Sequence, residues 1–178
     1  TQGRRCHWRT AGTSAGGINS LITILNSCSD SIENVTDSVN YKFWYNGGLE
    51  NIYDKKLITE NKLFKLPPES ISMMSIRQKW FQGIKKNCKA YLGLTFTHLD
   101  AKRYKVNELI SSPHMKEFIA LEIVGNGYNK APSIKTINLD KDNNFYIPFD
   151  GSDKEKYDVL ENLIYATSAF PIAFEPKE

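Results

Sequence analysis

Residues 11–21 read Ala11-Gly12-Thr13-Ser14-Ala15-Gly16-Gly17-Ile18-Asn19-Ser20-Leu21, and they match the G-x-S-x-G pattern of a nucleophile elbow. A serine hydroxyl is a poor nucleophile until it is held exposed and given a base. A sharp turn between a strand and a helix exposes it, and the glycines Gly12 and Gly16 leave room where the two elements pass closely. The pattern therefore predicts a strand-to-helix turn at Ser14.

A helix is expected directly after Ser14. Its apolar residues fall at positions i, i+3, i+4 and i+7, which form one helical stripe: Ile18, Leu21, Ile22 and Leu25. The backbone N–H of Ala15 and the positive end of the helix dipole would then face an oxyanion formed beside Ser14. The alternative is that Ser14 only caps a buried helix after a glycine-rich turn.

A second motif ends the chain and reads Ala166-Thr167-Ser168-Ala169-Phe170-Pro171-Ile172-Ala173-Phe174-Glu175-Pro176. Together with the elbow, in this order and at about this separation, it resembles the patatin-like phospholipases over residues 10–178. The resemblance implies a three-layer α/β/α fold and hydrolysis of phospholipids or other lipid acyl esters. It also implies a serine–aspartate dyad without histidine, in which Ser14 is the nucleophile.

The resemblance implies two parts that residues 1–178 do not display. The family's aspartate sits in a D-G-G or D-G-A motif after the F-x-P segment, and its glycine-rich oxyanion loop precedes the elbow. Gly3-Arg4-Arg5 is a poor substitute for that loop, because it offers one glycine and two long side chains. We therefore expect residues 1–178 to be an internal part of a single patatin-like domain, with both parts outside it. No metal or organic cofactor is implied.

Composition is that of an ordinary globular chain, with 40% hydrophobic and 24% charged residues. The formal net charge of +3, from 23 basic and 20 acidic residues, predicts no nucleic-acid partner. No apolar run approaches the ~20 residues of a membrane span, and no signal peptide is visible. A cytoplasmic or membrane-peripheral location is favoured.

Residues 70–99 carry basic side chains and no acidic one: Arg77, Lys79, Lys85, Lys86 and Lys89. This basic segment suggests a peripheral contact with an anionic membrane. The alternative is a solvated helix face whose charges serve only solubility.

The three cysteines, Cys6, Cys28 and Cys88, are scattered and form no C-x-x-C pair, so we expect buried free thiols rather than a zinc or redox site. Asn34-Val35-Thr36 is a glycosylation sequon, but nothing in the sequence gives it a secretory context.

Elsewhere the sequence predicts elements from periodicity and turn residues. Residues 1–10 look too polar for the strand that leads into a buried elbow. Residues 30–40 read as a loop, and residues 115–124 fit either a helix or a strand. The aromatic-rich residues 41–53 fit either a cap near an acyl-binding cleft or the edge of the core.

The remaining predictions concern helices and strands along the second half of the chain. A helix over 70–86 has Met73, Ile76, Trp80 and Ile84 on its apolar face, widened by Met74 and Phe81. A capping box, Ser152-Asp153-Lys154-Glu155, opens a helix that ends near Ser168. Strands are expected over 91–97, 133–139 and 144–149, and residues 98–106 turn polar.

Other residues compete with the dyad as a candidate site. Ser14, Asp100 and His114 have the order of an α/β-hydrolase triad. Asp150, in Asp-Gly-Ser, could be a base, although Asp-Gly favours a turn. A phosphate-binding loop fits the sequence less well than these two sites, because no Gly-Lys-Ser/Thr follows the glycines. A catalytically inactive lipid-binding or interaction module that retains the elbow is the alternative from another class.

Overall fold

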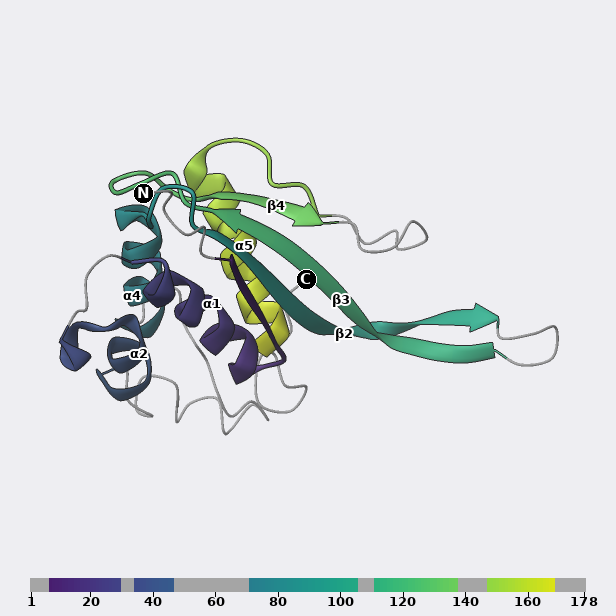
Figure 1. The fold of residues 1–178 in the computed structure, drawn as a ribbon. Coiled ribbons are helices and arrows are strands. Elements are labelled where there is room, and N and C mark those ends of the chain that lie inside the picture. Colours follow the sequence, from purple (N-terminus) through teal and green to yellow (C-terminus); the bar gives the residue numbers. More distant parts are fainter. Residues whose placement is uncertain (1–6, 30–33, 47–70, 106–110, 138–146, 169–178) are drawn as a thin grey trace.

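A four-stranded sheet in the order β1-β2-β3-β4 is the centre of the structure, which is a computed structural model (Figure 1). The structure describes residues 7–29, 34–46, 71–105, 111–137 and 147–168, without the side chains of residues 71, 97–105 and 111–116. Its elements are β1 (His7–Gly12), α1 (Ala15–Ser27), η1 (Val35–Asp37), α2 (Val39–Tyr41), η2 (Lys42–Asn46), α4 (Ile71–Gln82), β2 (Lys89–Lys105), β3 (Ser111–Val124), β4 (Ser133–Ile137) and α5 (Asp153–Ser168).

The sheet is mixed. Strand β1 runs parallel to β2, whereas β2 with β3 and β3 with β4 pair antiparallel. A parallel pair needs a long connection, and the segment that contains α1 and α4 supplies it. Strands β2 and β3 form a long hairpin whose outer part extends beyond the rest of the molecule (Figure 1). The described part of the chain is therefore an α/β fold with a mixed four-stranded sheet.

The core lies between one face of this sheet and the helices α1 and α5, which also contact each other. Alternate side chains of β2 and β3 point into it, and Leu92 of β2 is paired in register with Leu121 of β3. Both leucines are fully buried, and each such side chain contributes about 1.5–3 kcal/mol.

Helix α1 confirms the predicted stripe, because all four of its apolar positions are buried. Helix α5 confirms the capping box: Ser152 N–H donates to Glu155 Oε2 at 2.7 Å, and Glu155 N–H donates to Ser152 Oγ at 3.3 Å. Both helices were predictable because their signals are local to the chain.

Strand β1 shows that the interpretation of residues 1–10 was wrong in part, because residues 7–10 form a strand despite their polarity. Among the described strands β1 pairs on one side only, with Arg9 opposite Tyr91 and Thr10 opposite Leu92. An edge strand with exposed side chains tolerates polar residues, which a central parallel strand does not.

Other boundaries also differ from the predictions. Residues 35–41 form η1 and α2 instead of a loop, and Ser38 Oγ accepts from Tyr41 N–H at 3.2 Å to cap α2. Helix α4 ends at Gln82, and Met74 and Phe81 are exposed rather than part of its buried face. The predictions failed here because exposure depends on what lies opposite the helix.

The observed strands differ most from the predicted ones in the hairpin of β2 and β3. Residues 115–124 belong to β3, and β2 continues through the polar residues 98–105, because cross-strand pairing sustains both strands. Strand β4 ends at Ile137. Of the predicted strand 144–149, residues 147–149 are not in a strand, and the rest lie outside the described residues.

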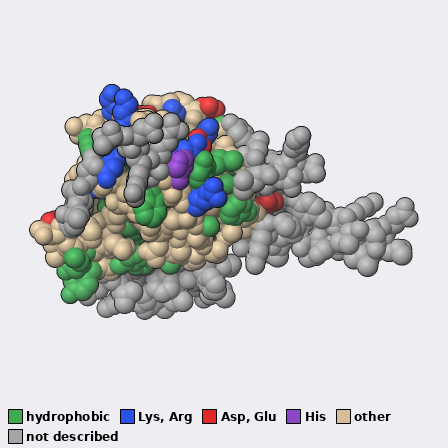
Figure 2. Space-filling model, viewed as in Figure 1, with side chains coloured by type: hydrophobic (Ala, Val, Ile, Leu, Met, Phe, Trp, Pro, Cys, Tyr) green, Lys and Arg blue, Asp and Glu red, His purple; other side chains and the backbone are tan. Residues whose placement is uncertain are grey.

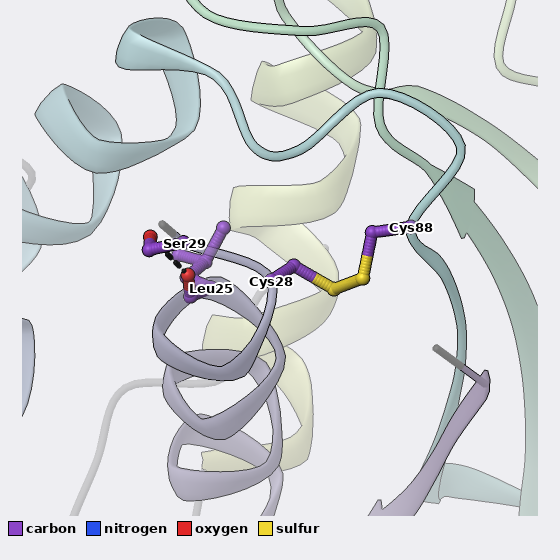
Figure 3. The surroundings of a disulfide bond; sticks show 4 residues. All are labelled: Leu25, Cys28, Ser29 and Cys88. Carbon is purple, nitrogen blue, oxygen red and sulfur yellow. Dashed lines mark hydrogen bonds between the residues drawn. A yellow bond between two sulfur atoms is a disulfide. The ribbon is translucent and has the colours of Figure 1, made fainter. Parts of the chain in front are cut away.

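The expectation of free thiols is wrong for two cysteines, because Cys28 and Cys88 form a disulfide with a Cα–Cα distance of 5.8 Å (Figure 3). Cys28 ends α1 and Cys88 precedes β2, which places distant parts of the sequence side by side. Lys85 N–H donates to the Cys28 carbonyl at 2.8 Å and holds the same junction. Cys6 lies outside the described residues.

Candidate functional site

Ser14 lies at the turn between β1 and α1, as the glycine pattern predicts. Its φ of 56° and ψ of −131° are a strained conformation for a residue with a side chain. Its carbonyl accepts from Gly17 N–H at 2.9 Å, so the first turn of the helix begins directly after the strain. This strained strand-to-helix turn is the backbone form that the G-x-S-x-G pattern predicts.

Gly12 is the glycine that the turn requires. A Cβ at Gly12 would clash with the Gly16 carbonyl group and lie 2.5 Å from Gly17 N. The close approach was therefore predicted correctly at Gly12. A Cβ at Gly16 would meet nothing within 4 Å, so Gly16 contributes its backbone to the contact and does not itself need to be glycine for space.

The end of α5 packs against the elbow turn and is hydrogen-bonded to it. Thr167 accepts from Ser14 N–H through its carbonyl at 2.9 Å, and its hydroxyl donates to the Thr95 carbonyl at 2.8 Å. A Cβ on Gly17 would lie only 2.7 Å from the Thr167 methyl carbon, so α1 and α5 approach closely there. The two motifs behind the family resemblance, 153 residues apart from Ser14 to Thr167, thus meet directly.

Two threonines of the site were missed from the sequence. The hydroxyls of Thr13 and Thr95 lie 2.5 Å apart, which connects the turn to β2. The only signal available was the position of Thr13 inside the elbow, since Thr95 reads simply as a strand residue. Their hydrogen bond holds the residue before Ser14 to the same strand that binds Thr167.

Some of the groups that would stabilise an oxyanion beside Ser14 are present. Ala15 is the first residue of α1, and across the described residues its N–H donates no hydrogen bond. The first turn of α1 contains no acidic side chain, so the positive end of the helix is not neutralised from within. In the described part of the chain the Ser14 hydroxyl also has no hydrogen-bond partner.

The alternative bases are poorly placed. Asp150 precedes α5, and Thr167 is near its other end, which puts Asp150 about 20 Å from the elbow along the helix. Strand β1 ends at Gly12, which is paired with Leu94, whereas Asp100 lies six residues further along β2. That separation is about 20 Å along a strand. His114 is paired with Lys102, still further along the hairpin.

A hollow of about 450 Å³ lies on the sheet face opposite α1 and α5. Small residues form its floor, namely Ala11, Gly93 and Ala120, and the Phe118 ring forms a wall. A Cβ at Gly93 would lie 2.8 Å from that ring, so the glycine makes room for it. Ala11 is three residues before Ser14, which places this hollow at the elbow end of β1.

Among the aromatic residues 41–46, one side chain packs in the core, as the second interpretation of this stretch predicts, and the cap near an acyl-binding cleft stays a prediction. Phe43 is buried in the core, whereas Trp44 and Tyr45 are exposed. Trp44 Nε1 donates to Asn19 Oδ1 on α1 at 2.7 Å. The rest of the aromatic-rich stretch, including Tyr53, lies outside the described residues.

The basic segment does not form one continuous patch. Arg77 pairs with Glu161 at 2.7 Å, Lys89 pairs with Glu122 at 2.5 Å, and Lys79 is buried. On the side of the molecule that Figure 2 shows, basic side chains occur at several separate places, with hydrophobic side chains between them. Lys86 is exposed, and Lys85 is half-buried.

The pKa values of the two ion-paired carboxylates are shifted in opposite directions. Burial raises the pKa of Glu161, and Arg77 offsets only part of that shift. Hydrogen bonds from Lys89 and Lys135 lower the pKa of Glu122. Burial also raises the pKa of Tyr157, whose ring lies under the Arg77 guanidinium at 5.5 Å.

Neither a metal site nor a membrane span is found in the described ranges. No three His, Cys, Asp or Glu side chains there are grouped so that they could hold a metal ion. No helix there is both long enough and apolar enough to cross a membrane.

Comparisons of the chain with family models, with curated proteins and with solved structures found no match.

Proposed function

We propose that the protein is a serine acyl hydrolase of the patatin type, which cleaves phospholipids or other lipid acyl esters. The observation that carries this proposal is the strained Ser14 turn held by Thr167. An elbow motif alone matches by chance in some chains. A chance match would not be expected to join the second motif of the same family through a backbone hydrogen bond.

In the proposed reaction the Ser14 hydroxyl attacks the ester carbonyl, and a carboxylate takes its proton as general base. The Ala15 N–H donates to the oxyanion that forms, and a donor of this kind typically lowers the barrier by about 3–4 kcal/mol. The base is an aspartate that the resemblance expects after Glu178. The resemblance likewise expects further oxyanion donors in a glycine-rich loop before the elbow.

We further propose the three-layer α/β/α arrangement for the whole domain. Helices α1 and α5 form one layer on the sheet. The opposite face has the 450 Å³ hollow with small residues on its floor, and such a surface suits a packed helix. Its apolar lining supports a second helical layer there.

A non-catalytic lipid-binding or interaction module is the second candidate. It is favoured by the Ser14 hydroxyl, which has no base beside it within the described residues. In this module the elbow would be retained for its fold alone.

The test is hydrolysis by the full-length protein, with phosphatidylcholine vesicles and a short-chain nitrophenyl ester as substrates. Ser14→Ala should reduce turnover to background and leave the thermal transition unchanged, because the Ser14 hydroxyl has no described partner to lose. Ser27→Ala is the matched control, since it makes the same change at the other end of α1. Equal turnover of the Ser14→Ala variant and the parent, or no turnover in either, would reject the hydrolase in favour of the module.

A further inference from the structure

Two features that the proposed function does not use lie close together in the sequence: the Cys28–Cys88 disulfide and the sequon Asn34-Val35-Thr36. We propose that Asn34 carries an N-linked glycan, added in the same oxidising secretory compartment in which this disulfide forms. The proposal is independent of the hydrolase activity.

The disulfide favours an oxidising compartment, whereas the sequence alone favoured a cytoplasmic or membrane-peripheral location. Both cysteines are almost fully buried, at 0% and 3% exposure, and their bond joins residues 60 positions apart. Disulfides persist in oxidising compartments and are rare in the cytosol. In forming it, the two thiols give up two electrons and two protons to the disulfide of an oxidoreductase, which becomes a dithiol. A sequon on such a chain meets the glycosylation machinery.

The sequon itself is accessible. Asn34, Val35 and Thr36 are all exposed, and Val35 is 77% exposed. Asn34 precedes η1, and its side chain makes no capping hydrogen bond to that turn. The backbone holds the turn instead, since the Asn34 carbonyl accepts from Asp37 N–H at 2.8 Å. Across the described residues the Thr36 hydroxyl also has no hydrogen-bond partner.

The position leaves space for a glycan. Residues 34–46 lie at the outer margin of the molecule, beside α1 and away from the long hairpin (Figure 1). A bulky, hydrophilic group at Asn34 would therefore extend into solvent without displacing a buried side chain. Among residues 1–178 this triplet is the single N-x-S/T sequon, so the proposal names one site.

The modification is a group transfer from a lipid-linked oligosaccharide pyrophosphate. The Asn34 side-chain nitrogen forms a bond to C1 of the first sugar, and the bond from C1 to the phosphate oxygen breaks. The lipid pyrophosphate leaves with that electron pair, and the amide nitrogen loses one proton to a base of the transferase. Thr36 is the residue that the transferase recognises in the sequon.

One peptide reports both parts of the proposal. Trypsin cleaves after Arg9 and Lys42, and residues 10–42 contain no other lysine or arginine. That peptide carries Cys28 and Asn34 together, and the disulfide attaches it to residues 87–89. The full-length protein should be expressed in a eukaryotic cell from its own coding sequence, digested without reduction, and analysed by mass spectrometry before and after peptide-N-glycosidase treatment.

We expect peptide 10–42 to be linked to residues 87–89 and to carry a glycan, which the glycosidase removes with conversion of Asn34 to aspartate. Asn34→Gln and Thr36→Ala should abolish the modification, whereas Thr36→Ser should retain it because serine also completes a sequon. Asn40→Gln, a change of another exposed asparagine, should have no effect. An unmodified Asn34 in the parent, with the disulfide formed or with both thiols free, would overturn the proposal, as would a glycan that survives Thr36→Ala.

Discussion

The two ends of helix α1 are built in opposite ways. At the first end, Ser14 has a positive φ, and the Ala15 N–H donates no hydrogen bond in the described part of the chain. At the other end, Cys28 is buried and bonded to Cys88 (Figure 3). Its carbonyl accepts a hydrogen bond from Lys85 N–H. We call the end of α1 at Ser14 and Ala15 the open end, because its first N–H donates no described hydrogen bond. We call the end at Cys28 the closed end, because a disulfide fixes it.

The difference suggests how the strain is maintained. A residue in a rare backbone conformation persists only where its surroundings fix it. Buried contacts along α1 and the disulfide fix the position of the helix, and Thr167 holds the strained residue through its N–H. The open end is therefore held by the closed end and by α5.

The largest effect is expected at the closed end. Changing Cys28 and Cys88 together to alanine should lower the free energy of unfolding by about 4 kcal/mol, because the bond closes a loop of 60 residues in the unfolded chain. Urea unfolding of the variant and of the parent, each with and without reductant, measures this. Reductant should destabilise the parent and leave the variant unchanged. A parent that does not respond to reductant would show that the bond contributes nothing.

At the open end, Gly12→Ala should lower the free energy of unfolding by about 3 kcal/mol or more, because its methyl group would clash with the backbone of the first turn of α1. Gly16→Ala is the matched control. Its methyl group enters open space, and alanine favours a helix by about 1 kcal/mol over glycine. Thermal unfolding of both variants should separate them. Equal losses would show that the elbow is not packed as described.

A smaller effect is expected where α5 meets the elbow. Thr167→Val keeps the shape of the side chain but removes the hydrogen bond to the Thr95 carbonyl, which should cost about 1 kcal/mol. Ser168→Ala removes a bond within α5 and should cost less, since its acceptor Ile164 belongs to the same helix. Urea denaturation midpoints of the two variants, each compared with that of the parent, test whether the contact between the motifs stabilises the fold. Equal shifts of the two midpoints would show that it does not.

Outside both ends of α1, the two buried glutamates should respond to pH in opposite directions. Because the pKa of Glu161 is raised in the folded state, this residue stabilises the fold at low pH, and that stabilisation is lost as the pH rises through the folded pKa. Because the pKa of Glu122 is lowered in the folded state, this residue stabilises the fold above pH 4.5, and that stabilisation is lost as the pH falls through the folded pKa.

Unfolding free energies measured from pH 3 to pH 8 check this. Glu161→Gln should flatten the fall on the neutral side of the profile, and Glu122→Gln should flatten the fall on the acid side. If Glu122→Gln alone changed the neutral side of the profile, the two glutamates would have the opposite pKa shifts to those described.

The smallest effect concerns membrane contact. Lys86 is exposed, and in the described structure it forms no ion pair. Because a basic residue at an anionic surface contributes about 1 kcal/mol, Lys86→Gln should weaken binding to anionic vesicles about fivefold at low salt. Lys156→Gln on α5 is the control. Equal binding by parent and both variants, independent of salt, would remove the basic segment as the docking surface.

Features carried by short stretches of sequence were predictable. The elbow turn, the stripe of α1 and the capping box of α5 each follow from spacing within about a dozen residues. Strand β1 and the disulfide did not follow, because a polar strand depends on pairing with β2 and the disulfide depends on the fold that brings Cys28 to Cys88. At the candidate site the turn at Ser14 was predicted, whereas Thr95 was missed because it contributes only through its contacts with Thr13 and Thr167.

The central claim is that Ser14 is an activated nucleophile, and covalent labelling of the full-length protein by a fluorophosphonate tests it most directly. We predict that the label is found on Ser14 within peptide 10–42, that a phospholipid substrate slows its attachment, and that Ser14→Ala abolishes it while Ser27→Ala does not. Attachment at another residue, or lipid ester hydrolysis that persists in the Ser14→Ala variant, would contradict the claim.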